Sequence, residues 1–470
     1  MSAGDGPGRR VIVATCEKGA AEDVASLRAV KAGLDRVAAE NPNFVDIAGR
    51  TVWRPRHPAP VVDGGSRVRR RAQARLRHRR ASLRVGVPRV LNMYTYAPLF
   101  SAYLESLGVT ADRIVYSDFT SPELYRTGSS RGSIDPCYPS KVAIAHVQNL
   151  LTVKQRRHKL DCIFFPMFDV LDSALVGTRA QNACPTVAAT PQTVRAAFTK
   201  EADAFAEAGI AYLDPLIDLG NRPLFARQMF ETWSPLLGLS RAENQQAVEA
   251  GFAALETFWQ GLRQDARAVL DRLEQEDRLG IVVLGRPYHH DPGINQGILE
   301  DLQKRGYPVF SQMVLPRDED LLERLFGDEV RDGVIHHPLD ISDVWKHSTS
   351  ENTNQKIWAA KFVARHPNLV ALEFSSFKCG LDAPIYSVVE EIIEAAGRPY
   401  LAFKDLDENR AAGAIKLRVE TIDYFLKRYR EEAASTWRTL RDIEQQVAAY
   451  ARGLQQRADV RRRPVGHPQP

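Results

Sequence analysis

Short apolar segments alternate with longer amphipathic segments in two series along this chain, and this alternation constrains the fold more than any other feature. The apolar segments of the first series are 84–91, 113–119 and 159–168, and those of the second are 281–288, 307–311, 368–376 and 398–406. Strands that alternate with helices at this pitch are typical of a parallel sheet covered on both faces. We therefore predict an α/β fold with two Rossmann-like parallel-sheet domains.

A long helical pattern separates the two series. Ser240 and Glu243 have the capping-box spacing, and apolar residues then recur at steps of three and four as far as Leu273. We predict a bridging helix at 240–275 between one α/β domain at 84–239 and another at 276–430. The flanks are predicted to be an N-terminal helical arm with a basic linker (1–83) and a C-terminal helical extension with a disordered tail (431–470).

The formal net charge of +5 depends on one segment, because nine arginines and no acidic residue lie between Arg67 and Arg84. The rest of the chain carries a small negative net charge, which is unlike a basic nucleic-acid-binding domain. The arginine segment has no interleaved aromatic residues for stacking on bases. We interpret it as a solvated linker that docks on an acidic partner.

Several function classes are excluded by missing patterns. No apolar run approaches the roughly 18 residues of a membrane-spanning helix, and the N-terminus lacks the apolar core of a signal peptide, so we expect a cytoplasmic protein. The phosphate loop G-x-x-x-x-G-K-[ST], a G-x-G-x-x-G after a strand, H-E-x-x-H, C-x-x-C and G-x-S-x-G are all absent. The simplest ATPase, dehydrogenase, zinc-protease and serine-hydrolase interpretations therefore fail.

Three of the five cysteines share a context that suggests chemistry. Cys137 (DPCYP), Cys184 (NACPT) and Cys379 (FKCGL) each lie beside Pro or Gly, where strands of doubly wound folds meet the functional crevice. Thiolates near helix N-termini have lowered pKa values and bind soft metals. The alternative is three small buried residues in turns. We expect Cys162 to be a core residue of an apolar strand and Cys16 to be a surface thiol.

A second candidate site follows the strand at 281–288. Arg286 and His289 come directly after this strand, and Asn295 can begin the next helix, so the three could bind a phosphate or another anion. The alternative is that they only cap the edge of the sheet. Asp382 and Lys141 are placed to tune a nearby metal site but suit ordinary salt bridges or helix ends better.

An ordered set of motifs resembles a known family. In chain order the motifs are GVPRVLNMY, SDFTS, DPCYPSK, NACPTV, GRPYHHDP, SSFKCGLDAP and KDLDEN, and the resemblance spans roughly residues 16–430. They resemble the carboxy-terminal part of CoA-substrate-specific enzyme activases, which are related to 2-hydroxyacyl-CoA dehydratase systems. That part of the activases is itself similar to dehydratase subunits with Rossmann-like domains and a cysteine-bound [4Fe–4S] cluster.

The resemblance implies a [4Fe–4S] cluster on Cys137, Cys184 and Cys379, and a CoA thioester as a possible ligand. Many relatives have further cysteines where this chain has none between Cys162 and Cys184. The activases also begin with ATPase domains, and nothing in this chain resembles their phosphate loops. We therefore expect the ATPase activator to be encoded separately and assign no ATPase activity to this chain.

Two principal hypotheses for the function follow, and the residues alone do not assign a catalytic group. The first is an iron–sulfur redox module that passes electrons to, or acts on, a CoA-thioester system. The second is a non-catalytic partner subunit that scaffolds the ATPase activator without a cluster. A thiol or zinc site built from the same cysteines is a third possibility.

Overall fold

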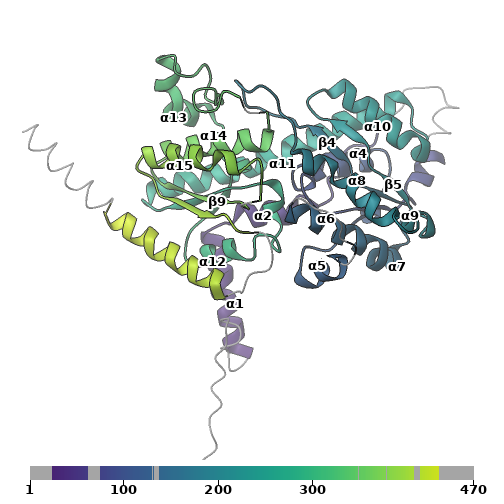
Figure 1. Ribbon diagram of the computed structural model, residues 1–470, viewed down its shortest axis with the longest axis horizontal. Coiled ribbons are helices and arrows are strands. Elements are labelled where there is room, and N and C mark those ends of the chain that lie inside the picture. Colours follow the sequence, from purple (N-terminus) through teal and green to yellow (C-terminus); the bar gives the residue numbers. More distant parts are fainter. Residues whose placement is uncertain are drawn as a thin grey trace, which may run out of the picture. The chain divides into compact units, whose positions relative to one another are not determined.

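Two four-stranded parallel sheets organise the protein (Figure 1), as the alternation predicts. The computed structural model describes residues 24–61, 75–129, 131, 137–347, 349–376, 378–406 and 413–432. The first sheet has the order β2-β1-β3-β5, with strands Ile114–Tyr116, Val85–Val87, Cys162–Phe164 and Ala211–Leu213. The second has the order β10-β9-β7-β8, with strands Tyr400–Phe403, Leu369–Phe374, Gly280–Leu284 and Val309–Ser311. The α/β prediction is confirmed.

The two sheets share one topology. In each sheet the first strand is central, the second lies on one side of it, and the third and fourth follow on the other side. This order creates a switch point between the first and third strands, where loops leave the sheet in opposite directions and a crevice opens. In the second sheet the switch point lies between β7 and β9, which pair along their whole length from Gly280 to Leu284.

Helices surround each sheet to form two lobes. The first lobe carries α4 (Met93–Ser106), α5 (Pro122–Ser129), α6 (Tyr138–Asn149), α8 (Pro185–Thr199) and α10 (Arg222–Leu237), together with a small parallel sheet of β4 (Met167–Val170) and β6 (Leu216–Asp218). The second lobe carries α12 (Ile298–Lys304), α13 (Glu319–Arg331), α14 (Glu351–Arg365) and α15 (Tyr386–Ala395). Strands β7 and β9 are buried at every position, as strands covered on both faces must be.

One 35-residue helix, α11 (Arg241–Gln275), contacts both lobes. The predicted capping box is confirmed, since Ser240 Oγ accepts from Glu243 N and the Glu243 carboxylate accepts from Ser240 N. In the first lobe Trp259 Nε1 donates to Thr95 O at 3.2 Å. In the second lobe Arg267 pairs with Asp320 of α13 at 2.7 Å. The helix therefore ties the lobes together within one compact unit.

The N-terminal region differs from a simple arm and linker. Helix α1 (Val24–Glu40) ends at Asn41-Pro42, as the residue before proline dictates. A second helix, α2 (Phe44–Thr51), follows, and the sequence pattern did not indicate it. Val309 N of β8 donates to Pro42 O at 2.9 Å, and the ring of Phe44 stacks on Phe310 at 5.5 Å. This part of the predicted arm packs against the edge strand of the second sheet.

The arginine segment is only partly a solvated linker. Residues 67–74 and Cys16 lie outside the described residues, and Arg79 is exposed. Arg80, however, is 2% exposed, and its Nη1 lies 2.9 Å from Oε1 of Glu243 in the capping box of α11. Its Nε also donates to Leu237 O at 2.7 Å. The interpretation of the segment as a solvated linker is therefore wrong at Arg80, because one arginine fastens the segment to α11.

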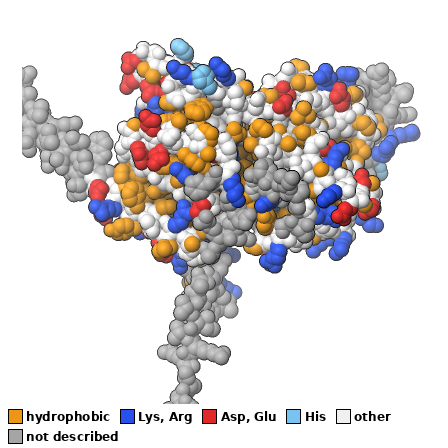
Figure 2. Space-filling view, in the orientation of Figure 1, with side chains coloured by type: hydrophobic (Ala, Val, Ile, Leu, Met, Phe, Trp, Pro, Cys, Tyr) orange, Lys and Arg blue, Asp and Glu red, His pale blue; other side chains and the backbone are white. Residues whose placement is uncertain are grey.

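Charge is mixed over the visible surface. Outside the grey regions of Figure 2, Lys and Arg side chains are interspersed with Asp and Glu, and no single basic patch covers the face shown. Among the described helices, none is long and apolar enough to cross a membrane.

Contacts divide the chain into two compact units, 1–411 and 412–470. In the second unit the described residues, 413–432, are helical. The remainder of the predicted tail lies outside the described residues. The division into the five segments proposed above stays a prediction.

Two glycines of α11 provide a test of its packing on α4. A Cβ on Gly251 would lie 2.8 Å from the backbone oxygen of Leu99, whereas a Cβ on Gly261 would have nothing within 4 Å. We expect Gly251→Ala to lower the free energy of unfolding by about 1–3 kcal/mol through overpacking. Gly261→Ala should raise it by about 0.5–1 kcal/mol through helix propensity. Urea denaturation of both variants measures this, and equal effects would contradict the packing.

Arg80 and Arg79 form a second matched pair. Arg80→Ala leaves Glu243 buried without its cation, so we expect a loss of about 3–5 kcal/mol of stability. The exposed Arg79→Ala should change stability by less than about 0.5 kcal/mol. Thermal and urea unfolding report both values. A small loss for Arg80→Ala would show that the segment does not fasten to α11 as described.

Candidate functional site

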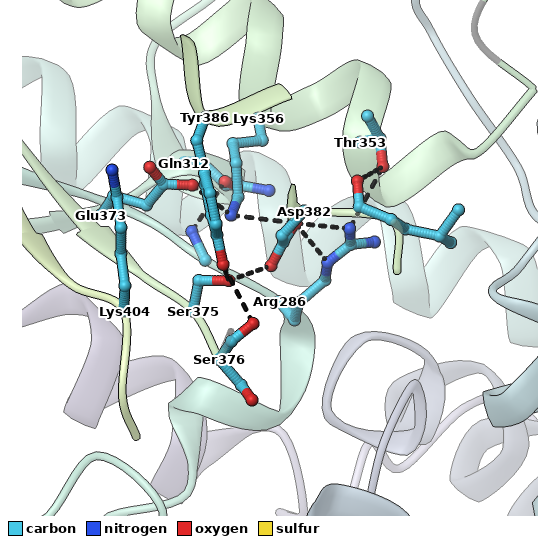
Figure 3. A network of polar contacts seen from close by, with 12 residues as sticks. Arg286, Gln312, Thr353, Lys356, Glu373, Ser375, Ser376, Asp382, Tyr386 and Lys404 are labelled. Atoms are coloured by element: carbon cyan, nitrogen blue, oxygen red, sulfur yellow. Dashed lines mark hydrogen bonds and ion pairs between the residues drawn. The ribbon is translucent and has the colours of Figure 1, made fainter. Parts of the chain in front are cut away.

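Four charged side chains are buried together at the switch point of the second sheet (Figure 3). Arg286 follows β7, Glu373 lies in β9, Lys356 lies on α14, and Asp382 lies in the loop after β9. Lys356, Glu373 and Asp382 are fully buried, and Arg286 is 4% exposed. Two positive and two negative groups balance here, which is the condition for keeping charges out of water.

Asp382 is the centre of this cluster. Its Oδ1 accepts from Arg286 Nη2 at 2.5 Å and lies 3.0 Å from Lys356 Nζ, while its Oδ2 accepts from Ser375 Oγ at 2.7 Å. Burial alone would raise the pKa of this carboxyl, but the charges of Arg286 and Lys356 outweigh burial and hold it far below its ordinary value. Asp382 is therefore ionised at any physiological pH.

The remaining contacts fix the cluster to the surrounding elements. Lys356 Nζ donates to Glu373 Oε1 at 2.9 Å, and Arg286 Nη2 donates to Thr353 Oγ1 at 3.1 Å. Ser375 Oγ also lies 2.8 Å from the hydroxyl of Tyr386 on α15. The strand ends of β7 and β9 and the starts of α14 and α15 are thus joined by polar contacts.

This cluster determines where Cys379 lies. Asp382 N and Ala383 N donate to Cys379 O at 3.2 and 3.0 Å, and Cys379 N donates to Ser376 O at 2.9 Å. The thiol is therefore held on a short turn whose far end is the buried Asp382. Burial and the Asp382 charge raise the pKa of Cys379, and Arg286 opposes this increase.

Cys137 and Cys184 occupy equivalent positions in the first lobe. Cys137 is the N-cap of α6 and Cys184 is the N-cap of α8, and each helix has a proline in its first turn. The two helices pack together, with Ser140 Oγ 2.8 Å from Thr190 Oγ1. Both cysteines are partly buried.

Tyr288 of the second lobe packs on α6, the helix that Cys137 caps. It comes two residues after Arg286 and packs against Tyr138 and Val142 of α6. Burial raises its pKa well above the ordinary value, and the nearby thiols of Cys379 and Cys137 raise it further. Both thiols therefore lie within electrostatic range of one phenol.

The segment before Cys184 contacts the start of helix α14. Asn182, two residues earlier, accepts from Glu351 N at 3.1 Å and donates its own N–H to Thr349 O at 2.8 Å. Thr353, on the first turn of the same helix α14, contacts Arg286. The segment before Cys184 therefore lies beside the start of α14, the helix that also contacts Arg286.

Cys137 and Cys379 both lie near Tyr288, and the segment before Cys184 contacts α14. Within the described ranges, no three side chains of the His, Cys, Asp or Glu type are grouped closely enough to hold a metal ion. Their ligand role stays a prediction. Cys162 lies in β3 with no exposed surface, and burial raises its pKa to about 12, so its assignment to the core is confirmed.

The predicted anion site is buried and internally bonded. His289 Nδ1 accepts from Arg286 N at 2.9 Å, and Asn295 Nδ2 donates to His289 O at 3.2 Å. Burial lowers the pKa of His289 to about 3, so this ring is neutral and supplies no charge to an anion. The next helix begins at Ile298 after Gly297, and not at Asn295 as expected. The binding role of all three residues stays a prediction.

Arg286 nevertheless has unused binding capacity. Its Nη1 is buried and has no hydrogen-bond partner among the described residues. A buried guanidinium N–H without an acceptor is costly, and an anion beside Cys379 would satisfy it.

The sequence reasoning missed Lys356, Glu373 and Tyr288. A signal was available for Glu373, since a lone carboxylate inside the apolar run 369–374 demands a buried cation. Lys356 provides that cation.

The fold and this region define a class of two-lobed α/β protein whose candidate site lies where switch-point loops of the second lobe meet helix N-termini of the first. Residues 84–315 match the family described as "CoA enzyme activase uncharacterised domain". This stretch of the chain is therefore similar to a CoA-substrate-specific enzyme activase-related family, as its motifs predict. No curated protein matches it in sequence.

Replacing Asp382 tests the charge cluster. We expect Asp382→Asn to lower stability at pH 7 by about 3–5 kcal/mol, because Arg286 and Lys356 lose their shared anion. The native carboxyl has a depressed pKa, so the unfolded chain binds more protons as the pH falls through about 4, and the wild-type advantage shrinks there.

Urea denaturation at pH 7 and pH 3 measures both effects. The exposed Asp332→Asn is the matched control and should change stability by less than about 0.5 kcal/mol. A difference between wild type and Asp382→Asn that grows at low pH would contradict the charge cluster.

Proposed function

We propose that the protein is a redox component of a CoA-thioester activation system, with a [4Fe–4S] cluster bound by Cys137, Cys184 and Cys379. The match of residues 84–315 to a CoA enzyme activase domain family supports a role in such a system. The observation that supports the cluster is that Cys379 of the second lobe and Cys137 of the first both lie near Tyr288.

The three cysteine thiols are suitable ligands for an iron–sulfur cluster. Thiols are the usual protein ligands of iron–sulfur clusters, and two of these cysteines are the N-cap residues of helices. A cluster with thiolate ligands is anionic, and the free Nη1 of Arg286 offers it a buried donor. Binding requires the sulfur atoms to approach one another more closely than they do here.

When bound, such a cluster would exchange single electrons and, with three protein ligands, would leave one iron position open to an oxygen ligand. The chain itself would supply the environment. Asp382 pairs with both Arg286 and Lys356 and so fixes the position of the Arg286 side chain. Tyr288 packs between this loop and helix α6. A buried arginine near the thiols favours the more negative, reduced state and raises the reduction potential.

A CoA thioester and a separately encoded ATPase activator are the partners that fit this role. Thioester binding through Arg286 would use the free Nη1, because Nε and Nη2 are already engaged by Asp382 and Thr353. In this arrangement the activator supplies the electron and the ATPase activity.

Anaerobic iron–sulfur reconstitution tests the proposal. We expect about four irons per chain, with the visible absorption of an iron–sulfur cluster and an electron paramagnetic resonance signal on reduction. Cys137→Ala, Cys184→Ala and Cys379→Ala should each lose most of the iron, because each removes one ligand. Elemental analysis and spectroscopy of the same samples measure this.

Cys162→Ala is the matched control, because Cys162 is buried in β3 away from the switch-point loops, and this variant should keep its iron. Iron-free protein that still binds an ATPase partner would contradict the cluster and favour the second hypothesis, a non-catalytic subunit that scaffolds the ATPase activator. Zinc in place of iron would identify a thiol–zinc site.

A further inference from the structure

A cavity lies between α4, α11 and the second lobe. It is separate from the thiol region, by which we mean Cys137, Cys184 and Cys379 with Arg286 and Tyr288. It has a volume of about 390 Å³, within the usual range of roughly 300–1,000 Å³ for small-molecule sites. Tyr96 of α4 and Trp259 of α11 line it from one side, and Arg317 and Gln355 line it from the second lobe. None of the residues assigned to the thiol region lines it.

Arg317 lacks the partners that a mostly buried guanidinium needs. Its Nε is buried without a hydrogen-bond partner anywhere in the part of the chain that the structure describes, and its guanidinium lies over the ring of Trp358, 5.3 Å from the centroid. Burial and the charge of the neighbouring Arg263 lower its pKa to about 10, and the carboxylates of Glu351, Glu256 and Asp172 oppose this decrease, so it remains a cation at neutral pH. An anion in direct contact would satisfy the unpaired Nε.

Two further features define the anion. Gln355 Oε1 is a buried acceptor that receives no hydrogen bond from any described residue, so it can take a donor from a ligand. Three carboxylates also line the cavity, those of Asp172, Glu256 and Asp318. They would repel a second negative charge, which disfavours a phosphate dianion relative to a single carboxylate.

We propose that this cavity binds a small organic carboxylate that also carries a hydrogen-bond donor. The carboxylate pairs with the guanidinium of Arg317, the donor reaches Gln355 Oε1, and the apolar body lies between Tyr96 and Trp259. This site does not depend on the proposed cluster, because it shares no residue with it.

Binding of defined carboxylates to the full chain tests the site. The probes are 4-hydroxybenzoate and 3-hydroxybutanoate, their neutral amides, and inorganic phosphate. Calorimetry measures their binding, and intrinsic tryptophan fluorescence, to which Trp259 contributes, follows it independently. At least one carboxylate should bind roughly ten-fold to a hundred-fold more tightly than its amide, the effect expected of a charged hydrogen bond. Phosphate should bind more weakly than that carboxylate.

Arg317→Lys and Arg317→Met identify the residue responsible. Arg317→Met should abolish the preference for carboxylate over amide, and Arg317→Lys should keep part of it because the charge remains. Arg227→Met, which changes an exposed arginine on α10, is the matched control and should bind as wild type does. Iron content should be unchanged in all three variants.

Stability measurements distinguish a binding role of Arg317 from a structural one. If Arg317 serves binding, Arg317→Met should leave the Tm of the ligand-free protein unchanged or raise it, because an apolar side chain replaces an unsatisfied charge over Trp358. If Arg317 serves the fold, the same substitution should lower the Tm. A clear fall in Tm, no carboxylate preference in wild type, or a preference that survives in Arg317→Met would overturn the proposal.

Discussion

The buried charge cluster of Arg286, Lys356, Glu373 and Asp382 is the constraint on which the second lobe depends. Each member comes from a different segment, and none can ionise in a protein interior without the others. The carboxyl ends of β7 and β9 are consequently held at one relative position. Because Cys379 lies three residues before Asp382 on a hydrogen-bonded turn, the same charges fix a thiol at the crevice.

Much of the fold was predictable because buried parallel strands give an unambiguous pattern. The apolar runs at 159–168, 281–288 and 368–376 became β3, β7 and β9, and the Ser240–Glu243 spacing gave the start of α11 correctly. Helix α2 was missed because it is only eight residues long and its first turn follows a proline-containing segment. Its stability comes from packing on β8, which a local pattern does not encode.

The candidate site was predictable only in part. Strand ends in an α/β sheet meet at one edge, so the sequence could place Arg286 and Cys379 together. It could not show that Tyr288 reaches α6 of the other lobe, because that contact depends on how the lobes pack. Arg80 was misjudged for the same reason, since a run of arginines indicates solvent unless a distant carboxylate such as Glu243 is known to lie beside it.

Helix α11 has a mechanical consequence for the angle between the lobes. It is about 50 Å long, is continuous from Arg241 to Gln275, and contacts α4 at one end and α13 towards the other. At Gly251 the helix approaches the backbone of Leu99 closely. Because α11 is continuous and packs on both lobes, a change in the angle between the lobes would have to bend this helix or break its contacts with α4 or α13.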